Sequence, residues 1–149
     1  MISQTVEYAL RAVVTIAQHG GAPLTAQRIS ELTKVPAPYL SKMLQSLVRA
    51  NLLGSQRGIN GGFTLNRSPE ELRILEVVNV VDPVRRIHTC PLGFSSHGTN
   101  LCPLHRRLDD AIASLEEVFR KSTVAEMLTQ KNLPTPLCDD RKAVTNIGD

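Results

Sequence analysis

Three side chains in the second half of the chain, Cys90, Cys102 and His105, are the residues best suited to chemistry. Cys102 and His105 are three residues apart at the predicted start of a long helix. A thiol and an imidazole therefore share one helix face and could bind one metal. The helix N-terminus also favours the thiolate form of Cys102. Soft thiolates combined with an imidazole suit an iron–sulfur cluster or zinc.

Other interpretations of these residues stay open at this point. Cys90 and Cys102 could form a reversible disulfide and sense thiol oxidation. They could also be small buried hydrophobic residues, with His105 capping a helix. A thiol enzyme is less favoured, because no third orienting residue, glycine-rich phosphate loop or paired carboxylates accompany the Cys/His pair. The third cysteine, Cys138, matches no motif.

The charge is distributed unevenly along the 149 residues, whose net charge is +3. Residues 1–67 carry seven Lys or Arg and two acids, which gives +5, and residues 68–149 carry ten basic and twelve acidic residues, which gives −2. A basic half suits binding to a polyanion, although a solvated basic surface is the simpler explanation. No apolar run approaches the ~20 residues that cross a bilayer, and the N-terminus lacks a signal-peptide pattern. We therefore expect a cytoplasmic protein with no membrane partner.

The first half predicts a winged helix-turn-helix. Apolar residues at helical spacing indicate a helix over 6–17, and Thr25 caps a short helix that extends to Lys34. A third helix is predicted from Pro38 to Ala50, after a proline-fixed turn. Residues 52–65 contain two short apolar strands around an Asn-Gly-Gly tip, which is typical of a β-hairpin wing. We therefore predict a mainly α fold with a small β-hairpin, and a DNA-binding domain over residues 1–67.

The second half predicts a connecting helix, a loop and a long dimerisation helix, over residues 68–128. Ser68 is expected to cap a helix that extends to Val81, and residues 84–103 read as an ordered loop. A helix beginning near Pro103 carries an apolar seam at steps of four and three residues, which favours a homodimer. The seam consists of Leu104, Leu108, Ala111, Leu115, Val118, Ser122 and Ala125. Residues 129–149 are expected to form a loose tail.

The exposed residues near the start of the third helix are candidates for reading DNA. Tyr39, Ser41 and Lys42 are placed to contact bases or phosphates in the major groove. Arg57 precedes flexible glycines in the hairpin, which suits insertion into a minor groove. Each of these residues taken singly could be a solvated surface group, and an adaptor that keeps the fold without binding DNA is an alternative. The joint arrangement favours binding to double-stranded DNA.

The sequence resembles bacterial winged-helix regulators of the IscR/NsrR type over roughly residues 1–128. The resemblance is carried by 7–12 (EYALRA), 35–40 (VPAPYL), 47–53 (LVRANLL) and the wing 57–65 (RGINGGFTL). It implies a homodimer with crossed long helices that binds a palindromic operator and usually represses transcription. It also implies that the positions contacting bases and phosphates are Pro38, Tyr39, Ser41, Lys42 and Arg57.

The same resemblance implies a set of metal ligands. Cluster-binding members carry three cysteines and a further ligand, and Cys90, Cys102 and His105 match the first cysteine, the third cysteine and a histidine. The middle cysteine falls on Ser96, beside His97. Glu7 matches a carboxylate that the partner subunit supplies in nitric-oxide-sensing members. These residues, with Glu7 or His97 as fourth ligand, are the expected set for a two-iron, two-sulfide cluster that senses iron–sulfur, redox or nitric oxide status.

Overall fold

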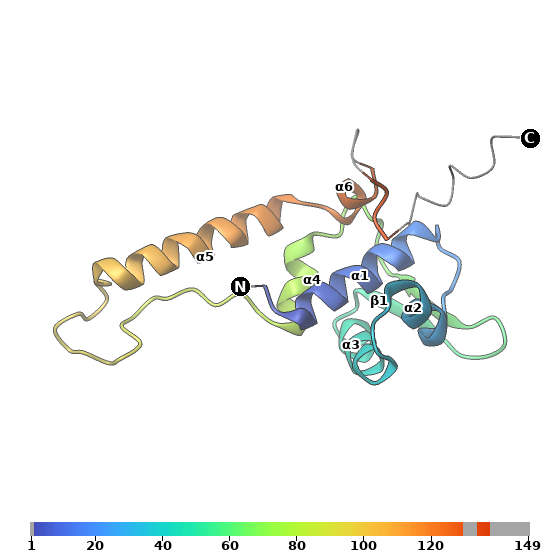
Figure 1. The fold of residues 1–149 in the computed structure, drawn as a ribbon, viewed down its shortest axis with the longest axis horizontal. Helices are drawn as coiled ribbons and strands as arrows, with labels where there is room; N and C mark the ends of the chain where they lie inside the picture. The colour runs from blue at the N-terminus through green and yellow to red at the C-terminus, as the bar shows by residue number, and fades with distance from the viewer. Residues whose placement is uncertain (1, 130–133, 138–149) are drawn as a thin grey trace, which may run out of the picture.

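The computed structural model describes residues 2–129 and 134–137 and consists of a head and an arm (Figure 1). The head comprises residues 2–81 and 122–129, and the arm comprises residues 82–121. The prediction that 129–149 form a loose tail falls mostly outside the described residues, as does Cys138. The head contains α1 (Gln4–Gln18), α2 (Ala26–Thr33), α3 (Ala37–Arg49), β1 (Leu53–Gln56), β2 (Gly62–Leu65), α4 (Ile74–Val81) and α6 (Val124–Leu128), and the arm contains α5 (Pro103–Lys121).

The first three helices form where the sequence predicts them, within two residues at each end. The hydroxyl of Ser3 accepts a hydrogen bond from Val6 N at 3.3 Å and caps α1, and the Thr25 hydroxyl caps α2 by accepting from Arg28 N at 3.2 Å. Pro38 lies in the first turn of α3, where a missing N–H costs nothing. The inward faces of these helices share one core with α4, whose fully buried members include Val13, Ile29, Leu40, Leu44, Leu47 and Val77.

The wing is a two-stranded antiparallel hairpin, as predicted. Its register pairs Leu53 with Leu65 at the base and Gln56 with Gly62 near the tip. Leu24 lies beside Phe63 and exchanges two backbone hydrogen bonds with it, of 3.1 and 2.7 Å. The hairpin is therefore fixed to the segment that joins α1 to α2.

The prediction that a helix begins at Ser68 is wrong. Residues 68–72 form a turn that is closed by a hydrogen bond from Leu72 N to Ser68 O, and α4 begins only at Ile74. The reason is a backbone pairing with a distant segment. Val124 N donates to Leu72 O, and Ile74 N donates to Ser122 O. These long-range hydrogen bonds occupy the groups that a helix from Ser68 would have used.

The prediction that the long helix continues through Ala125 is also wrong. Helix α5 ends at Lys121, because Ser122 is extended and its carbonyl accepts from Ile74 N. Thr123 then caps the separate helix α6 by accepting from Glu126 N, while Glu126 accepts from Thr123 N. The apolar seam along α5 therefore stops at Val118.

Candidate nucleic-acid interface and cysteine loop

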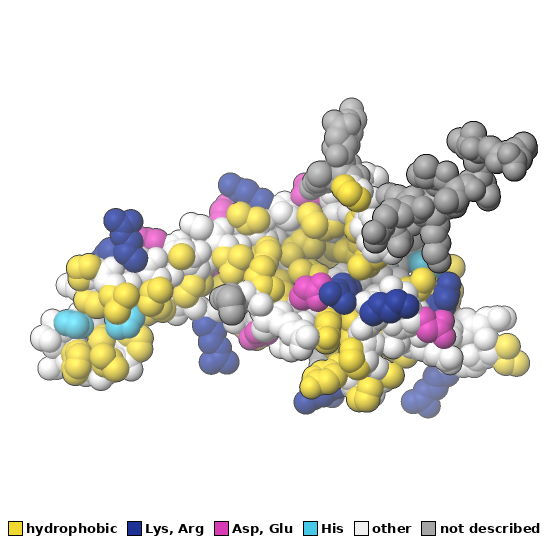
Figure 2. Space-filling view, in the orientation of Figure 1, with side chains coloured by type: hydrophobic (Ala, Val, Ile, Leu, Met, Phe, Trp, Pro, Cys, Tyr) yellow, Lys and Arg dark blue, Asp and Glu magenta, His cyan; other side chains and the backbone are white. Residues whose placement is uncertain are grey.

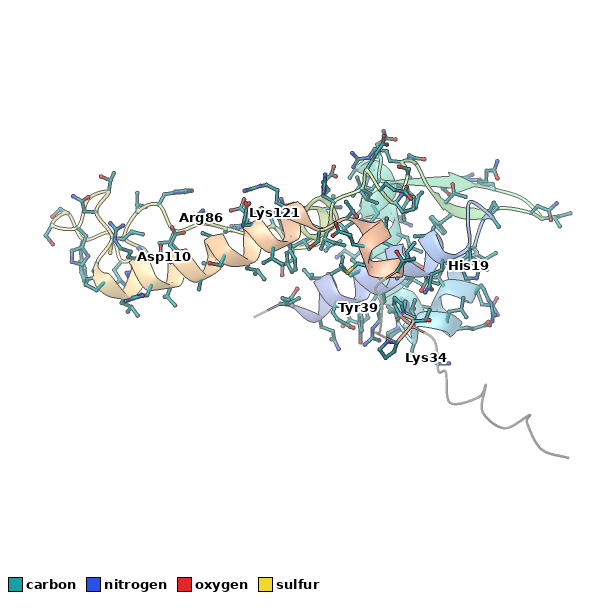
Figure 3. All side chains as sticks on the ribbon, turned by 90° about the horizontal axis from the view of Figure 1, so that it is seen from above. His19, Lys34, Tyr39, Arg86, Asp110 and Lys121 are labelled. Atoms are coloured by element: carbon teal, nitrogen blue, oxygen red, sulfur yellow. The ribbon has the colours of Figure 1, made fainter. Side chains whose placement is uncertain are left out.

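The predicted DNA-reading residues of α3 lie on its outer face. Pro38, Tyr39, Ser41 and Lys42 are all exposed, and Tyr39 is 67% exposed although it is a large aromatic side chain. The opposite face of α3 carries the buried leucines of the core. The amphipathic pattern of one helix thus separates the side chains that hold it in the head from those that can reach a ligand. Figure 3 shows Tyr39 on the head.

Four basic side chains within residues 2–67 have no acidic partner among the described residues. Arg11 pairs with Glu7, Arg28 with Glu31, and Arg67 with Glu76. The cations outside those pairs are Lys34, Lys42, Arg49 and Arg57. Cations without a local carboxylate are available to bind phosphates. These four lie on α3, in the turn that precedes α3 and on the wing.

The cysteine loop, residues 82–102, runs back along α5 (Figure 1). Arg86 in this loop binds Asp109 on α5, and Figure 3 shows Arg86 beside that helix. No sequence signal predicted this ion pair, because its two members are far apart in the chain. It holds the segment before Cys90 against the first half of α5.

Cys102 and His105 meet as the sequence predicts. Cys102 is the residue that precedes α5, and its Sγ lies 3.4 Å from His105 Nδ1. The backbone carbonyl of Cys102 accepts from Arg106 N, so the thiol is held at the first turn of the helix. This pair provides one sulfur and one nitrogen donor to a common point.

Cys90 has a separate partner, His97. Hydrogen bonding from His97 lowers the pKa of the Cys90 thiol, and hydrogen bonds from the backbone of Phe94 and Leu92 lower it further. The thiol is 8% exposed, whereas Leu92 and Phe94 are 68% and 52% exposed. Figure 2 shows apolar side chains together with histidine at the far end of the arm. The loop therefore combines a thiol of lowered pKa with an apolar surface.

Glu7, the remaining candidate ligand, lies on the head. Its Oε1 is 2.6 Å from Nε of Arg11, and it lines an apolar cavity of about 530 Å³. That cavity lies where the end of α5 meets α1, α6 and residues 134–137, and Val118 and Leu128 contribute to its wall. Figure 2 shows largely apolar surface in this region. The structure does not bring Glu7 to Cys90, Cys102 or His105 of the same chain.

Metal donors thus occur as two pairs, Cys90 with His97 and Cys102 with His105. Within residues 2–129 and 134–137, no group of three or more His, Cys, Asp or Glu side chains could hold a metal ion. Ser96, at the position of the middle cysteine, is exposed. The arrangement of one chain does not complete a ligand set for a cluster.

The three helices and the hairpin define a winged helix-turn-helix protein with a long helical arm. The chain belongs to the Rrf2 family of iron-dependent transcriptional regulators, whose model matches residues 2–130. It is 24% identical over 131 residues to a transcriptional regulator of the HTH type from Aquifex aeolicus, covering 86% of this chain and 91% of that protein. It is 26% identical over 127 residues to the HTH-type transcriptional regulator IscR of Sodalis glossinidius, covering 85% and 77%.

Two solved structures share the fold. IscR of T. potens has a TM-score of 0.73 at 24% identity and covers 91% of this chain and 93% of its own. CymR, the global cysteine regulator of B. subtilis, has a TM-score of 0.71 at 22% identity and covers 85% and 95%. The matched proteins are regulators of transcription, which favours this class over a thiol enzyme. No helix in the described part of the chain is long and apolar enough to span a membrane.

Proposed function

We propose that this protein is a homodimeric transcription regulator that binds a palindromic operator in double-stranded DNA and represses the adjacent genes. The observation that carries the proposal is the placement of unpaired cations on the outer face of α3 and on the wing. Lys42 and Arg57 both project from the head with no carboxylate partner among the described residues. The repressor role follows from the resemblance to IscR/NsrR-type regulators. Because chromosomal DNA is the target, the protein acts in the cytoplasm.

The homodimer is supported by helix α5. It is 19 residues long, yet none of its residues is buried. Leu104, Leu108 and Val118 are 63%, 47% and 60% exposed, so much of the apolar seam is uncovered within the described chain. In proteins, most of the stability of a helix comes from the packing of its apolar face. A second copy of the same seam would bury these side chains and fix the distance between two heads.

The DNA-binding proposal is tested with a duplex that the full-length protein selects from a randomised pool. Lys42→Ala and Arg57→Ala should each weaken binding at least roughly fivefold, and each should reduce the salt slope of log K by about 1. Lys121→Ala, which removes an exposed cation from the end of α5, is the matched control and should bind normally. Normal affinity and salt slope in both head variants would overturn the assignment of α3 and the wing.

We further propose that the cysteine loop is the redox-sensing part of the protein. The support is the lowered pKa of Cys90, the close pair of Cys102 and His105, and the fixation of the loop to the proposed dimer helix. A chemical change at the thiols would shift α5 and hence the spacing of the heads. A cluster would need a ligand that one chain does not place there, and the partner subunit's Glu7 is the candidate from the family resemblance.

The proposed sensing role of the cysteine loop can be tested on protein purified anaerobically. Visible spectroscopy and assays for iron and sulfide show whether it holds a cluster. Stoichiometric iron and sulfide that disappear in Cys90→Ser or Cys102→Ser would support cluster sensing. A colourless protein whose DNA affinity changes on mild oxidation, except in those two variants, would support thiol sensing. DNA affinity that is the same in the wild type under both conditions, in a protein without iron, would exclude both forms of the proposal.

A further inference from the structure

The tip of the wing presents an isoleucine to solvent. A hydrogen bond of 3.0 Å from Gly61 N to Gly58 O closes a turn, and Ile59 and Asn60 occupy its two central positions. The side chain of Ile59 is 103% exposed, more than any other large hydrophobic side chain described in the chain. Turn centres ordinarily carry Pro, Gly, Asn or Asp, whereas β-branched residues suit strands. The isoleucine side chain is therefore not required for the turn and does not pack in the core of the head.

The backbone next to this tip is tightly packed. A Cβ on Gly62, where φ is +148°, would lie 2.5 Å from the backbone of Leu24. A Cβ on Gly61 would lie 2.3 Å from Gln56 O, so the hairpin closes tightly just behind the tip. The neighbouring residue Phe63 pairs with Leu24, which fixes this part of the hairpin to the head. Ile59 is therefore projected from a braced hairpin and not from a loose loop.

The surroundings of Ile59 are suited to DNA and not to an apolar protein partner. Residues 53–67 contain Arg57 and Arg67 and no acid, and Arg57 is two positions from Ile59. A narrow minor groove attracts arginine, and proteins that enter it often insert an apolar side chain between base steps. The wing tip provides both the arginine and the apolar side chain, because the exposed Ile59 lies near the unpaired Arg57.

We propose that Ile59 is an apolar wedge that enters the minor groove beside Arg57 and opens a base step, thereby bending the operator. The inference rests on the proposed DNA binding and adds a residue that selects for deformable DNA. Pyrimidine–purine steps unstack most easily, so the step under the wing should be TA or CA. Loss of the wedge should reduce both the bend and the preference for such a step.

The test compares Ile59→Thr with wild type on a duplex selected by the full-length wild-type protein, with a dye at each end. Energy transfer between the dyes reports bending, and fluorescence anisotropy of the same duplex reports affinity. We expect Ile59→Thr to bind roughly fivefold more weakly and to lose most of the bend, because opening a step is offset by apolar contact. Ile59→Leu, which keeps an apolar side chain, should retain the bend.

Two controls distinguish loss of the wedge from a general effect of removing an apolar side chain and from misfolding. Leu92→Thr removes another exposed apolar side chain, which lies in the cysteine loop, and should change neither readout. Because Ile59 has no packing role, the thermal unfolding of Ile59→Thr should match that of wild type. An unchanged bend, affinity and step preference in Ile59→Thr would overturn the wedge while DNA binding stands. Failure of the wild type to select any duplex would overturn the proposed function itself.

Discussion

Arg86 and Asp109 form a two-pronged ion pair that ties the cysteine loop to helix α5. Nε of Arg86 donates to Oδ1 of Asp109 at 2.7 Å, and Nη2 donates to Oδ2 at 2.6 Å. Ile87 N also donates to Asp109 Oδ1 at 2.8 Å, so one carboxylate holds both a side chain and the backbone of the loop. Bidentate pairs of this kind fix orientation as well as distance. The position of Cys90 relative to α5 therefore depends on Asp109.

Replacing Asp109 with Asn should loosen the cysteine loop and leave the head intact. The amide has no charge and only one acceptor oxygen, so the bidentate ion pair with the guanidinium is lost and the Ile87 N–H loses a charged acceptor. We expect hydrogen exchange to become at least roughly tenfold faster over residues 83–90, with no change in α1–α3. Asp110→Asn changes the neighbouring exposed carboxylate and serves as control. Unchanged exchange in Asp109→Asn would show that the ion pair does not hold the loop.

The same ion pair predicts a dependence of stability on pH. The Arg86 guanidinium and the Ile87 N–H hold the pKa of Asp109 well below its ordinary value near 3.9. A lowered carboxyl pKa contributes stability that is fully present above the unfolded pKa and is lost as pH falls through the folded pKa. The urea midpoint of wild type should exceed that of Asp109→Asn at pH 7 and pH 5, and the difference should shrink below about pH 4. A difference that grows toward acid pH would contradict the pairing.

The exposed seam of α5 predicts the oligomeric state. Leu108→Arg places a charge in the middle of the seam and should convert the protein to a monomer at concentrations where wild type is a dimer, as measured by analytical ultracentrifugation. Asp110→Arg introduces the same side chain on another face of α5 and should remain dimeric. A dimer of normal affinity in Leu108→Arg would mean that the seam is not the interface.

The close approach of Gly62 to Leu24 predicts that a side chain at position 62 would displace the wing from the head. Alanine there requires a strained φ of +148° and a Cβ that lies 2.5 Å from Leu24. Gly62→Ala should destabilise the head by about 1–3 kcal/mol and weaken DNA binding, because the wing must move away from Leu24. Gly93→Ala is matched in having a positive φ of +70° but has open space around its Cβ, so it should leave the wing and DNA affinity unchanged. Equal effects of the two substitutions on DNA affinity would contradict the docking.

The sequence predicts the head well because its signals are local. Thr25 is a cap next to an amphipathic stretch, and the Asn60-Gly61-Gly62 tip lies between two short strands. The start of α4 and the end of α5 could not be predicted in the same way. They are set by hydrogen bonds between residues 69–74 and 122–125, and these segments are brought together only by the folded head. The Thr123-x-x-Glu126 capping pattern was a local signal for α6 that the seam obscured.

In the candidate site, too, local arrangements could be predicted from the sequence and long-range contacts could not. The proximity of Cys102 and His105 follows from helical spacing, and the exposure of Tyr39 and Lys42 follows from the amphipathic pattern of α3. The ion pair of Arg86 and Asp109 has no sequence signal, because it depends on the path of the loop. The role of Glu7 depends on a second subunit and stays a prediction.

The claim that a dimer binds DNA through α3 and the wing is tested most directly by hydroxyl-radical footprinting of the full-length protein on its selected duplex. Two heads held by paired α5 helices should protect two symmetric half-sites whose centres are about one helical turn, or a multiple of about 10 base pairs, apart. Protection of the minor groove by the wings should flank or lie between them, and it should disappear in Arg57→Ala. A single unsymmetric footprint, or protection that Lys42→Ala and Arg57→Ala leave unchanged, would contradict a dimer that reads DNA through α3 and the wing.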